Sequence, residues 1–408
     1  MSVGPRADGR LDTVGVASAM NRRTLLRRAG MAAGTIVVGG AGALGYRAYD
    51  QGVLQLGQGP AYEPWADWKG HMGLMPLVAA ATLAPNPHNS QPWLFRVGSG
   101  RIDLFADASR NIGAVDPFKR EKYIGLGAAL ENLVVAAEAT GYRAKVTLMP
   151  DGAHPDHAAR VELTHASRHN TFLADQIAKR HTNRYGFVTG KDVPAAAMTA
   201  MTGLSDAETS GARVIWFSNN RQRVELSSLI VAATEAINRD PDQSRSDYQW
   251  FRQNWDQIQR QRDGITIDAA GLPELTATLA KLLPAQSRQA IDDAWLTATR
   301  DSHTKTAAAY GIVAVRDAAD SQQRLKGGRL LERVHLWATG NGIALHHMNQ
   351  LTERADRERE LAINPRFGDA LQQLLPDGWQ ALSLFRIGYP THSPNKSPRR
   401  ALAAVIVS

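Results

Sequence analysis

The chain contains no cysteine among its 408 residues. It therefore has no disulfide framework, no thiolate zinc or iron–sulfur site and no catalytic thiol, an absence that fits an oxidising compartment. Charged residues are modest in number, at 21% of the sequence, while 43% is hydrophobic. These ordinary globular proportions exclude collagen-like, mostly disordered and multi-span membrane proteins, and they allow a sizeable core.

Common catalytic and metal-binding signatures are missing as well. The sequence has no Gly-x-Ser-x-Gly elbow, no Walker loop and no His-Glu-x-x-His pair. His154 and His157 lie in a loop-like segment with proline and glycine and have no partner ligands nearby in sequence. We therefore predict no metal site.

The net charge of +8 is unevenly distributed along the chain. Residues 1–50 hold seven arginines and three aspartates, a balance of +4, so half of the excess lies in this first segment. Beyond it we find no dense basic stripe interleaved with aromatic residues. Nucleic acid is therefore not expected as a partner.

The N-terminal segment has the pattern of an export leader. Asn21–Arg27 resembles a twin-arginine signal, Met31–Leu44 is weakly apolar, and Ala41–Ala43 offers small residues to a signal peptidase. We predict a leader over 1–45 that engages the twin-arginine translocase and directs the protein to the periplasm or cell envelope, cleaved or retained as an anchor. The alternative is a disordered basic tail on a cytoplasmic protein.

The sequence patterns divide the rest of the chain into two halves, 60–168 and 169–408. Both halves contain predicted helices and strands. The predicted helices are 72–82, 123–140, a short one ending at 179, 195–204, 221–238 and 329–340. The predicted strands are 93–97, 101–105, 145–149, 161–163, 213–217, 310–315, 343–348 and 383–388. The segments starting at Gly127 and Gly328 can be aligned with each other, which is a sign of duplication.

Residues 240–308 interrupt the second half. They are polar, rich in Gln, Arg and Asp, and contain helical stretches, so they are typical of an inserted helical subregion. Trp250, Trp255 and Trp295 lie within this insertion. They either pack its interior or cover a site elsewhere on the chain.

Three segments carry residues suited to binding a planar, anionic ligand. In Ala84–Trp93, prolines fix the backbone while amides stand beside an aromatic residue. In Lys179–Arg184, two arginines and a threonine alternate, so an extended chain would project all three to one side as a phosphate clamp. Lys396–Arg400 is a second basic segment. Taken alone, each segment also has a structural interpretation: backbone capping, neutralisation of a helix end, or a solvated tail.

Together these segments resemble the nitroreductase family of FMN-binding oxidoreductases. The family's Pro-x-x-x-Asn-x-Gln-Pro-Trp loop matches from Pro85 to Trp93, and its Arg-x-Ser/Thr-x-Lys/Arg stretch matches from Arg180 to Arg184. The order of the two motifs is reversed here. This order resembles the tandem, twin-arginine-exported Acg-like group, in which one chain imitates a homodimer. The resemblance covers roughly residues 65–400, apart from the insertion.

The resemblance implies an α+β, nitroreductase-like fold, with two tandem halves forming a pseudo-dimer and central sheets flanked by helices. It also implies a set of FMN-binding residues and leaves the catalytic residues open. The cofactor-binding residues it implies are Pro85, Asn86, His88, Asn89, Gln91, Arg180, Thr182, Arg184, Met348, Asn349, Gln350, Lys396, Arg399 and Arg400. Met348–Gln350 departs from the Glu-Gly that the family usually has beside flavin N5.

The function implied is an FMN-dependent oxidoreductase that transfers hydride or electrons through flavin N5 to small-molecule acceptors, with the donor unspecified. We expect one FMN per chain and a monomer. The alternative is a protein that binds or sequesters FMN without turnover, its site closed by the insertion acting as a lid.

Overall fold

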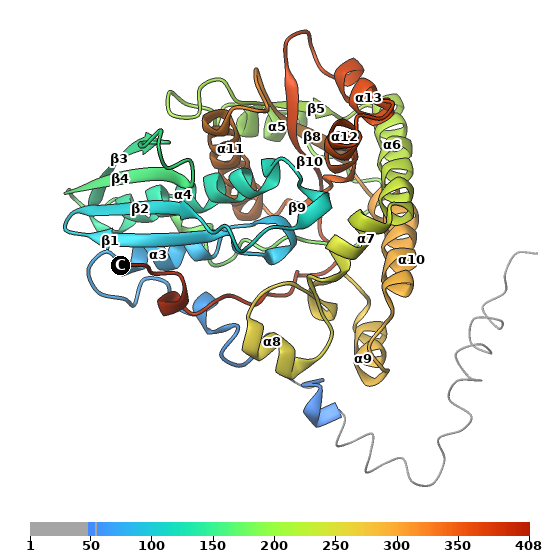
Figure 1. Cartoon of the computed structure of the whole chain (residues 1–408), viewed down its shortest axis with the longest axis horizontal. Coiled ribbons are helices and arrows are strands. Elements are labelled where there is room, and N and C mark those ends of the chain that lie inside the picture. The colour runs from blue at the N-terminus through green and yellow to red at the C-terminus, as the bar shows by residue number, and fades with distance from the viewer. Residues whose placement is uncertain (1–47, 54) are drawn as a thin grey trace, which may run out of the picture. The chain divides into compact units, whose positions relative to one another are not determined.

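The computed structural model describes residues 48–53 and 55–408 (Figure 1). The leader predicted over 1–45 lies outside these residues. None of the helices in the described ranges is long and apolar enough to span a membrane. The α+β class predicted from the sequence is confirmed, with one four-stranded sheet in each predicted half.

The first sheet is antiparallel, in the order β1-β2-β4-β3. Its β1–β2 hairpin is the one predicted from Gly98-Ser99-Gly100, where Gly100 takes a φ of +65°. Apolar residues of α3 and α4 pack on this sheet in one core. The elements are β1 (Trp93–Gly98), β2 (Arg101–Ala106), β3 (Tyr142–Leu148), β4 (His157–His165), α3 (Met75–Thr82) and α4 (Arg120–Thr140).

The second sheet is also antiparallel, in the order β5-β8-β10-β9. Every residue of β8 is buried, because α11 packs on one face of the sheet and α6, α12 and α13 on the other. The elements are β5 (Arg213–Phe217), β8 (Ala309–Val315), β9 (Ala344–His347), β10 (Gln380–Gly388), α5 (Ala195–Thr202), α6 (Asn220–Arg239), α11 (Ser321–Gly340), α12 (Gln350–Glu360) and α13 (Arg366–Leu374).

The two halves meet along α4 and α11, the helices whose sequences can be aligned. A Cβ atom on Gly127 would lie 2.2 Å from the Leu325 carbonyl oxygen, and one on Gly328 would lie 2.1 Å from the Ile124 carbonyl oxygen. Only glycine permits so close an approach of two backbones. The aligned glycines therefore mark the crossing point of the helices.

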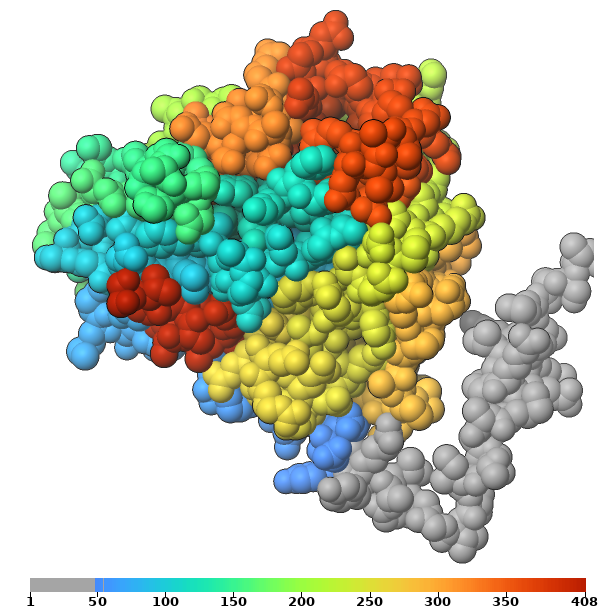
Figure 2. All heavy atoms as spheres, in the orientation of Figure 1, coloured from blue at the N-terminus to red at the C-terminus, as the bar shows by residue number. Residues whose placement is uncertain are grey.

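The chain also crosses between halves at its C-terminus. Phe95 of β1 donates its N–H to the carbonyl of Val405 at 2.7 Å, and Val407 donates back to Phe95 at 2.8 Å. Figure 2 shows this final segment, in dark red, lying against the blue and cyan residues of the first half. The tail after β10 is thereby held against the first sheet.

The insertion is helical, as the sequence predicts, and contains one pair of very short parallel strands. Its α7 packs beside the loop around Gly113–Val115 of the first half, and its α10 packs beside α6. Its elements are α7 (Pro241–Tyr248), β6 (Phe251–Arg252), α8 (Trp255–Gln261), β7 (Ile265–Thr266), α9 (Glu274–Leu282) and α10 (Arg288–Ala298).

Several sequence predictions differ from the structure, and helix α13, for example, was not predicted. The helix ending at 179 is wrong, because that region forms only a 3-10 turn, Ala174–Gln176. The helix predicted over 329–340 begins earlier, at Ser321, where Asp320 caps it by accepting from the Gln322 N–H. Helix α12 was not predicted, because its strongly charged sequence hides the fact that much of it is buried.

Candidate functional site

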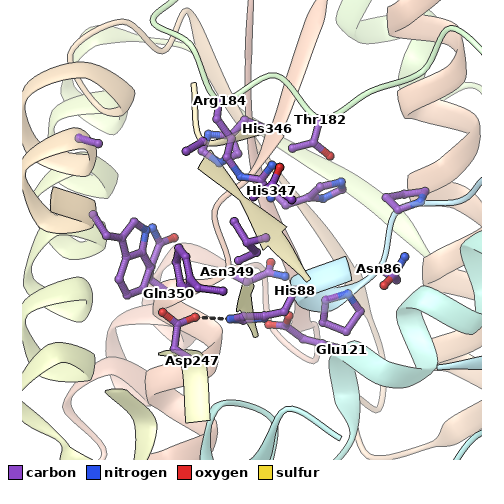
Figure 3. A pocket seen from close by; sticks show the side chains of 18 of the residues that line it. Asn86, His88, Glu121, Thr182, Arg184, Asp247, His346, His347, Asn349 and Gln350 are labelled. Atoms are coloured by element: carbon purple, nitrogen blue, oxygen red, sulfur yellow. Dashed lines mark hydrogen bonds and ion pairs between the residues drawn. The ribbon is translucent and has the colours of Figure 1, made fainter. Parts of the chain in front are cut away.

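A cavity of about 260 Å³ lies where the two halves and the insertion meet. The loop at 85–88 and the side of α4 form one wall, and side chains from the segments 182–184 and 346–350 form another. Residues of β6, β7 and α10 cover it from the insertion. Figure 3 shows side chains of all three parts pointing into this space.

The loop at 84–93 has a constrained backbone. His88, Asn89 and Gln91 all take positive φ values, between 51° and 53°. Asn86 stabilises the loop by accepting the Gln91 N–H at 2.7 Å through Oδ1. Pro85, Asn86 and His88 line the cavity, as the resemblance implies.

Asn89 and Gln91 do not line the cavity. The Asn89 amide donates to the carbonyls of Pro398 (2.9 Å) and Gly264 (3.2 Å). The Gln91 amide donates to the Arg262 carbonyl and accepts from the Arg400 N–H, each at 2.8 Å. For these two residues the structural interpretation holds, since they fasten the tail and the insertion to the loop.

The predicted arginine clamp is not assembled as the alternation implied. Thr182 and Arg184 line the cavity, but Arg180 points into the interior and is only 1% exposed. The Arg180 guanidinium donates to the Leu83 carbonyl at 2.6 Å and lies 3.2 Å from Glu332 Oε1. Residues 180–184 belong to no strand of either sheet, so the strict alternation of an extended strand does not apply to them.

The basic tail is likewise outside the cavity wall. Lys396 is exposed, and Arg399 is buried, donating to the carbonyls of Leu83 (3.1 Å) and Ala84 (3.2 Å). Arg400 donates to the Ala404 carbonyl at 2.7 Å. These arginines hold the tail against the 84–93 loop, and the structure does not bring them to the cavity.

The segment at 348–350 is divided between core and cavity. Met348 is fully buried in the core beneath β10 and does not reach the cavity. Asn349 lines it while accepting from the Ser383 hydroxyl and the Leu384 N–H, both at 3.0 Å. Gln350 also lines it, and within the described ranges its buried Oε1 has no hydrogen-bond partner.

One end of the cavity is cationic. The Arg184 guanidinium donates to the Ala269 carbonyl at 3.1 Å, and no carboxylate in the described part of the chain pairs with it. Burial lowers the pKa of Arg184 to about 10, so it remains charged at neutral pH. Burial, and then the charges of Arg180 and Arg184, lower the pKa of His347 to about 3, which keeps this cavity-lining imidazole neutral. An anionic group fits this end.

The opposite end of the cavity is acidic. Of the residues there, the resemblance implied only His88, and the sequence did not predict the carboxylates. Glu121 of α4 and Asp247 of α7 line this end (Figure 3), and so does Glu353 of α12. Glu121 stands in a run, Arg120-Glu121-Lys122, that reads as a solvated helix start, and Glu353 stands in an equally charged segment. The sequence carries no signal that these charges are buried.

The insertion covers the cavity with apolar side chains. Phe251, Ile265 and Trp295 line it, so Trp295 is the cavity tryptophan among the three in the insertion. Trp250 packs instead against Ile112 and Val115 of the first half. Trp255 stacks on Tyr62, with ring centroids 6.4 Å apart.

A charged contact joins the acidic end to this cover. His88 Nε2 of the first half forms a short ion pair with Asp247 of the insertion (Figure 3). Burial alone would lower the pKa of His88, but the Asp247 charge and hydrogen bond outweigh it, and the pKa is raised. At pH values below about 6.5, the ordinary pKa of an imidazole, the contact therefore stabilises the packing of the insertion over the cavity. This stabilisation is lost as the pH rises through the raised pKa of His88.

We expect the insertion to open more readily above that pKa. In limited proteolysis, the rate of cleavage within the insertion of the unaltered chain should rise with pH. The rise should be larger than the protease shows on an unstructured substrate over the same pH range. Asp247→Asn should give fast cleavage across the whole range, because the imidazole then loses its partner. Asp242→Asn, on the same helix but exposed and paired with arginines, is the matched control. Identical pH profiles for the unaltered and Asp247→Asn chains would contradict this.

Comparison with known proteins gives the following. No protein-family model matches the chain. It is 25% identical over 343 residues to the uncharacterized protein Rv3127 of Mycobacterium tuberculosis, covering 81% of this chain and 91% of that protein. It is 32% identical over 133 residues to "Putative NAD(P)H nitroreductase Rv3131" of the same species, covering 31% of this chain and 39% of that protein.

Solved structures give a weaker likeness. The FMN-dependent nitroreductase NfnB from Mycobacterium smegmatis, in complex with NADPH, is 17% identical, with a TM-score of 0.36 over 57% of this chain and 96% of its own. A nitroreductase with bound FMN from Bacteroides fragilis is 15% identical, with a TM-score of 0.34 over 58% of this chain and 98% of its own.

Proposed function

We propose that this chain is an FMN-dependent oxidoreductase of the nitroreductase family, with one FMN held in the cavity between its halves. The observation that carries the proposal is the cavity itself. It combines an arginine without a carboxylate partner among the described residues, apolar walls and buried polar atoms without partners. The motif resemblance and the name of the relative Rv3131 support the same family.

The residues present fit such a cofactor. Arg184 and Thr182 would hold an anionic phosphate or the polar edge of the ring at the cationic end. His347 Nε2 and Gln350 Oε1 are buried without partners in the part of the chain that is described, and both residues line the cavity, so a heterocycle edge would satisfy them. Phe251, Ile265 and Trp295 present apolar surface for a flat ring. FMN, when bound, supplies the hydride and electron transfer.

The tandem arrangement is part of the proposal. The cavity takes the 85–88 loop from the first half and the 182–184 and 346–350 segments from the second, so one chain provides what two subunits would otherwise share. We infer that the protein functions as a monomer. We also propose export by the twin-arginine route, which Arg22 and Arg23 support.

A second candidate function is FMN binding without turnover. The observation that favours it is the insertion, whose residues cover the cavity and are tied to His88 through Asp247. A buried flavin would then be protected from acceptors.

Turnover decides between the two. The FMN-loaded protein is mixed with NAD(P)H or a dithionite-reduced mediator, and the loss of a quinone or nitroaromatic acceptor is followed. An oxidoreductase should complete many turnovers per flavin. Bound flavin that is reduced but never passes electrons on would establish the sequestering function instead.

A further inference from the structure

Two glutamates meet at the acidic end of the cavity. Glu121 of α4 and Glu353 of α12 both line the cavity, and they are only 5% and 7% exposed. The charge of Glu121 raises the pKa of Glu353, so the two carboxyl groups lie close enough to repel each other when both are ionised. In a buried site this repulsion favours a state in which one of the two carries a proton.

Most of the positive charge near the pair is engaged by other groups. Arg120 lies 3.4 Å from Glu121 Oε1, but its Nε is bound to Asp356 at 2.7 Å. Asp116 accepts the N–H groups of Glu121 and Lys122, and Lys122 itself donates to the Asp107 carbonyl.

The cover adds no free positive charge at this end. Asp247 of the insertion faces the pair, and His88 is already paired with that carboxylate. Burial, followed by the charges of Glu121 and Asp247, raises the pKa of Glu353 well above its usual value. Glu353 therefore holds a proton more readily than an ordinary glutamate does.

We propose that the Glu121–Glu353 pair is the proton donor to an acceptor molecule reduced in this cavity. The inference rests on the proposed function, because that function supplies the reductant, a reduced flavin. A quinone that has received a hydride gains its second hydrogen as a proton from the pair. The O–H bond of the carboxylic acid breaks, its electrons remain on the carboxylate, and a new O–H bond forms on the product.

Water reprotonates the pair after the product leaves. While the site is closed, the apolar cover of Phe251, Ile265 and Trp295 keeps bulk water from serving as the donor. A carboxylic acid held inside the cavity is then the available source. The same arrangement disfavours a role in binding a cationic ligand, because a protonated pair beside Arg120 carries little net negative charge.

The experiment compares two acceptors with the FMN-loaded full-length chain. A quinone needs protons to form its product, whereas ferricyanide takes one electron and needs none. Glu353→Gln keeps the side-chain shape but cannot donate an acidic proton. General acid catalysis contributes about 10²–10⁴-fold, so quinone reduction should fall by roughly 100-fold. Ferricyanide reduction and FMN affinity should stay within about twofold.

The matched control is Glu358→Gln. Glu358 is a buried glutamate on the same helix, and it accepts the Phe367 and Gly368 N–H groups, an interaction that a carboxamide oxygen retains. It does not line the cavity. Both rates should remain near those of the unaltered chain.

Infrared spectroscopy provides a readout that does not depend on turnover. At neutral pH the unaltered chain should show C=O bands of neutral carboxylic acids, and Glu353→Gln should remove the component that belongs to Glu353, whereas Glu358→Gln should retain it. Burial raises the pKa of Glu332 to about 8, so its band remains in both variants and is assigned with Glu332→Gln. A spectrum that Glu353→Gln leaves unchanged would overturn the proposal, as would quinone and ferricyanide rates that are both unchanged or that fall together. A chain that reduces neither acceptor would refute the proposed function, while the band would still test the pair.

Discussion

Replacing Gly328 with alanine should destabilise the protein by about 3 kcal/mol or more, the upper end of what overpacking costs. The added Cβ would lie 2.1 Å from the Ile124 carbonyl oxygen and 3.0 Å from the Gly127 Cα, and both are backbone atoms that cannot rotate away. Helices α4 and α11 would have to separate along the contact that joins the two halves. The midpoint of urea unfolding, followed by circular dichroism, measures the loss.

Gly368→Ala is the matched control. Gly368 also lies in a helix, α13, but a Cβ there meets only the Pro365 side chain at 3.6 Å, an ordinary contact. Because alanine is the better helix former by roughly 0.5–1 kcal/mol, this variant should be as stable as the unaltered chain or more so. Equal midpoints for the two variants would mean that the halves do not meet at this glycine crossing.

The second large effect is expected at Arg184. Charge-assisted hydrogen bonds contribute about 1.5–3 kcal/mol each, so Arg184→Ala should weaken FMN binding about tenfold or more. Arg184 is the arginine of the predicted clamp that lines the cavity, and no carboxylate in the described ranges competes for it. Titration of the apoprotein with FMN, followed by flavin fluorescence, gives the affinity.

Arg400→Ala serves as the control for this test, because the structure places that arginine outside the cavity wall. The FMN affinity of Arg400→Ala should stay within about twofold of the unaltered value. This change is smaller than the one expected when a charge-assisted hydrogen bond to the ligand is lost. Riboflavin, which lacks the phosphate, should bind much more weakly than FMN to the unaltered chain. The assignment fails if riboflavin and FMN bind equally, or if Arg400→Ala costs as much as Arg184→Ala.

Much of the fold could be predicted from local patterns. The Gly98-Ser99-Gly100 turn specified the first hairpin, and Gly141, with a φ of +91°, ends α4 where the sequence predicts. Helix α12 escaped prediction for a physical reason. Its Arg354 and Arg357 are held by Asp240, more than a hundred residues away in sequence, so charges that look solvated are in fact paired across the fold.

The site was predictable only in part, because a motif specifies a backbone path better than the direction of a side chain. Pro85, Asn86 and Arg184 do line the cavity, whereas Arg180 turns inward to Glu332 and the Leu83 carbonyl. Nothing in the sequence near Glu353 indicates that it meets Glu121, since the pairing depends on how α4 and α12 pack. Such contacts between distant segments need the tertiary structure.

One FMN per chain is the central claim, because the 85–88 loop and the arginine stretch at 180–184 each occur once in the sequence. The direct measurement is the ratio of flavin to protein. The full-length chain is saturated with FMN, freed of excess ligand and denatured, and the released flavin is quantified by its visible absorbance against protein concentration. A ratio of one FMN per chain is the predicted result. A ratio approaching two would contradict a single site, and a chain that retains no flavin would contradict the site altogether.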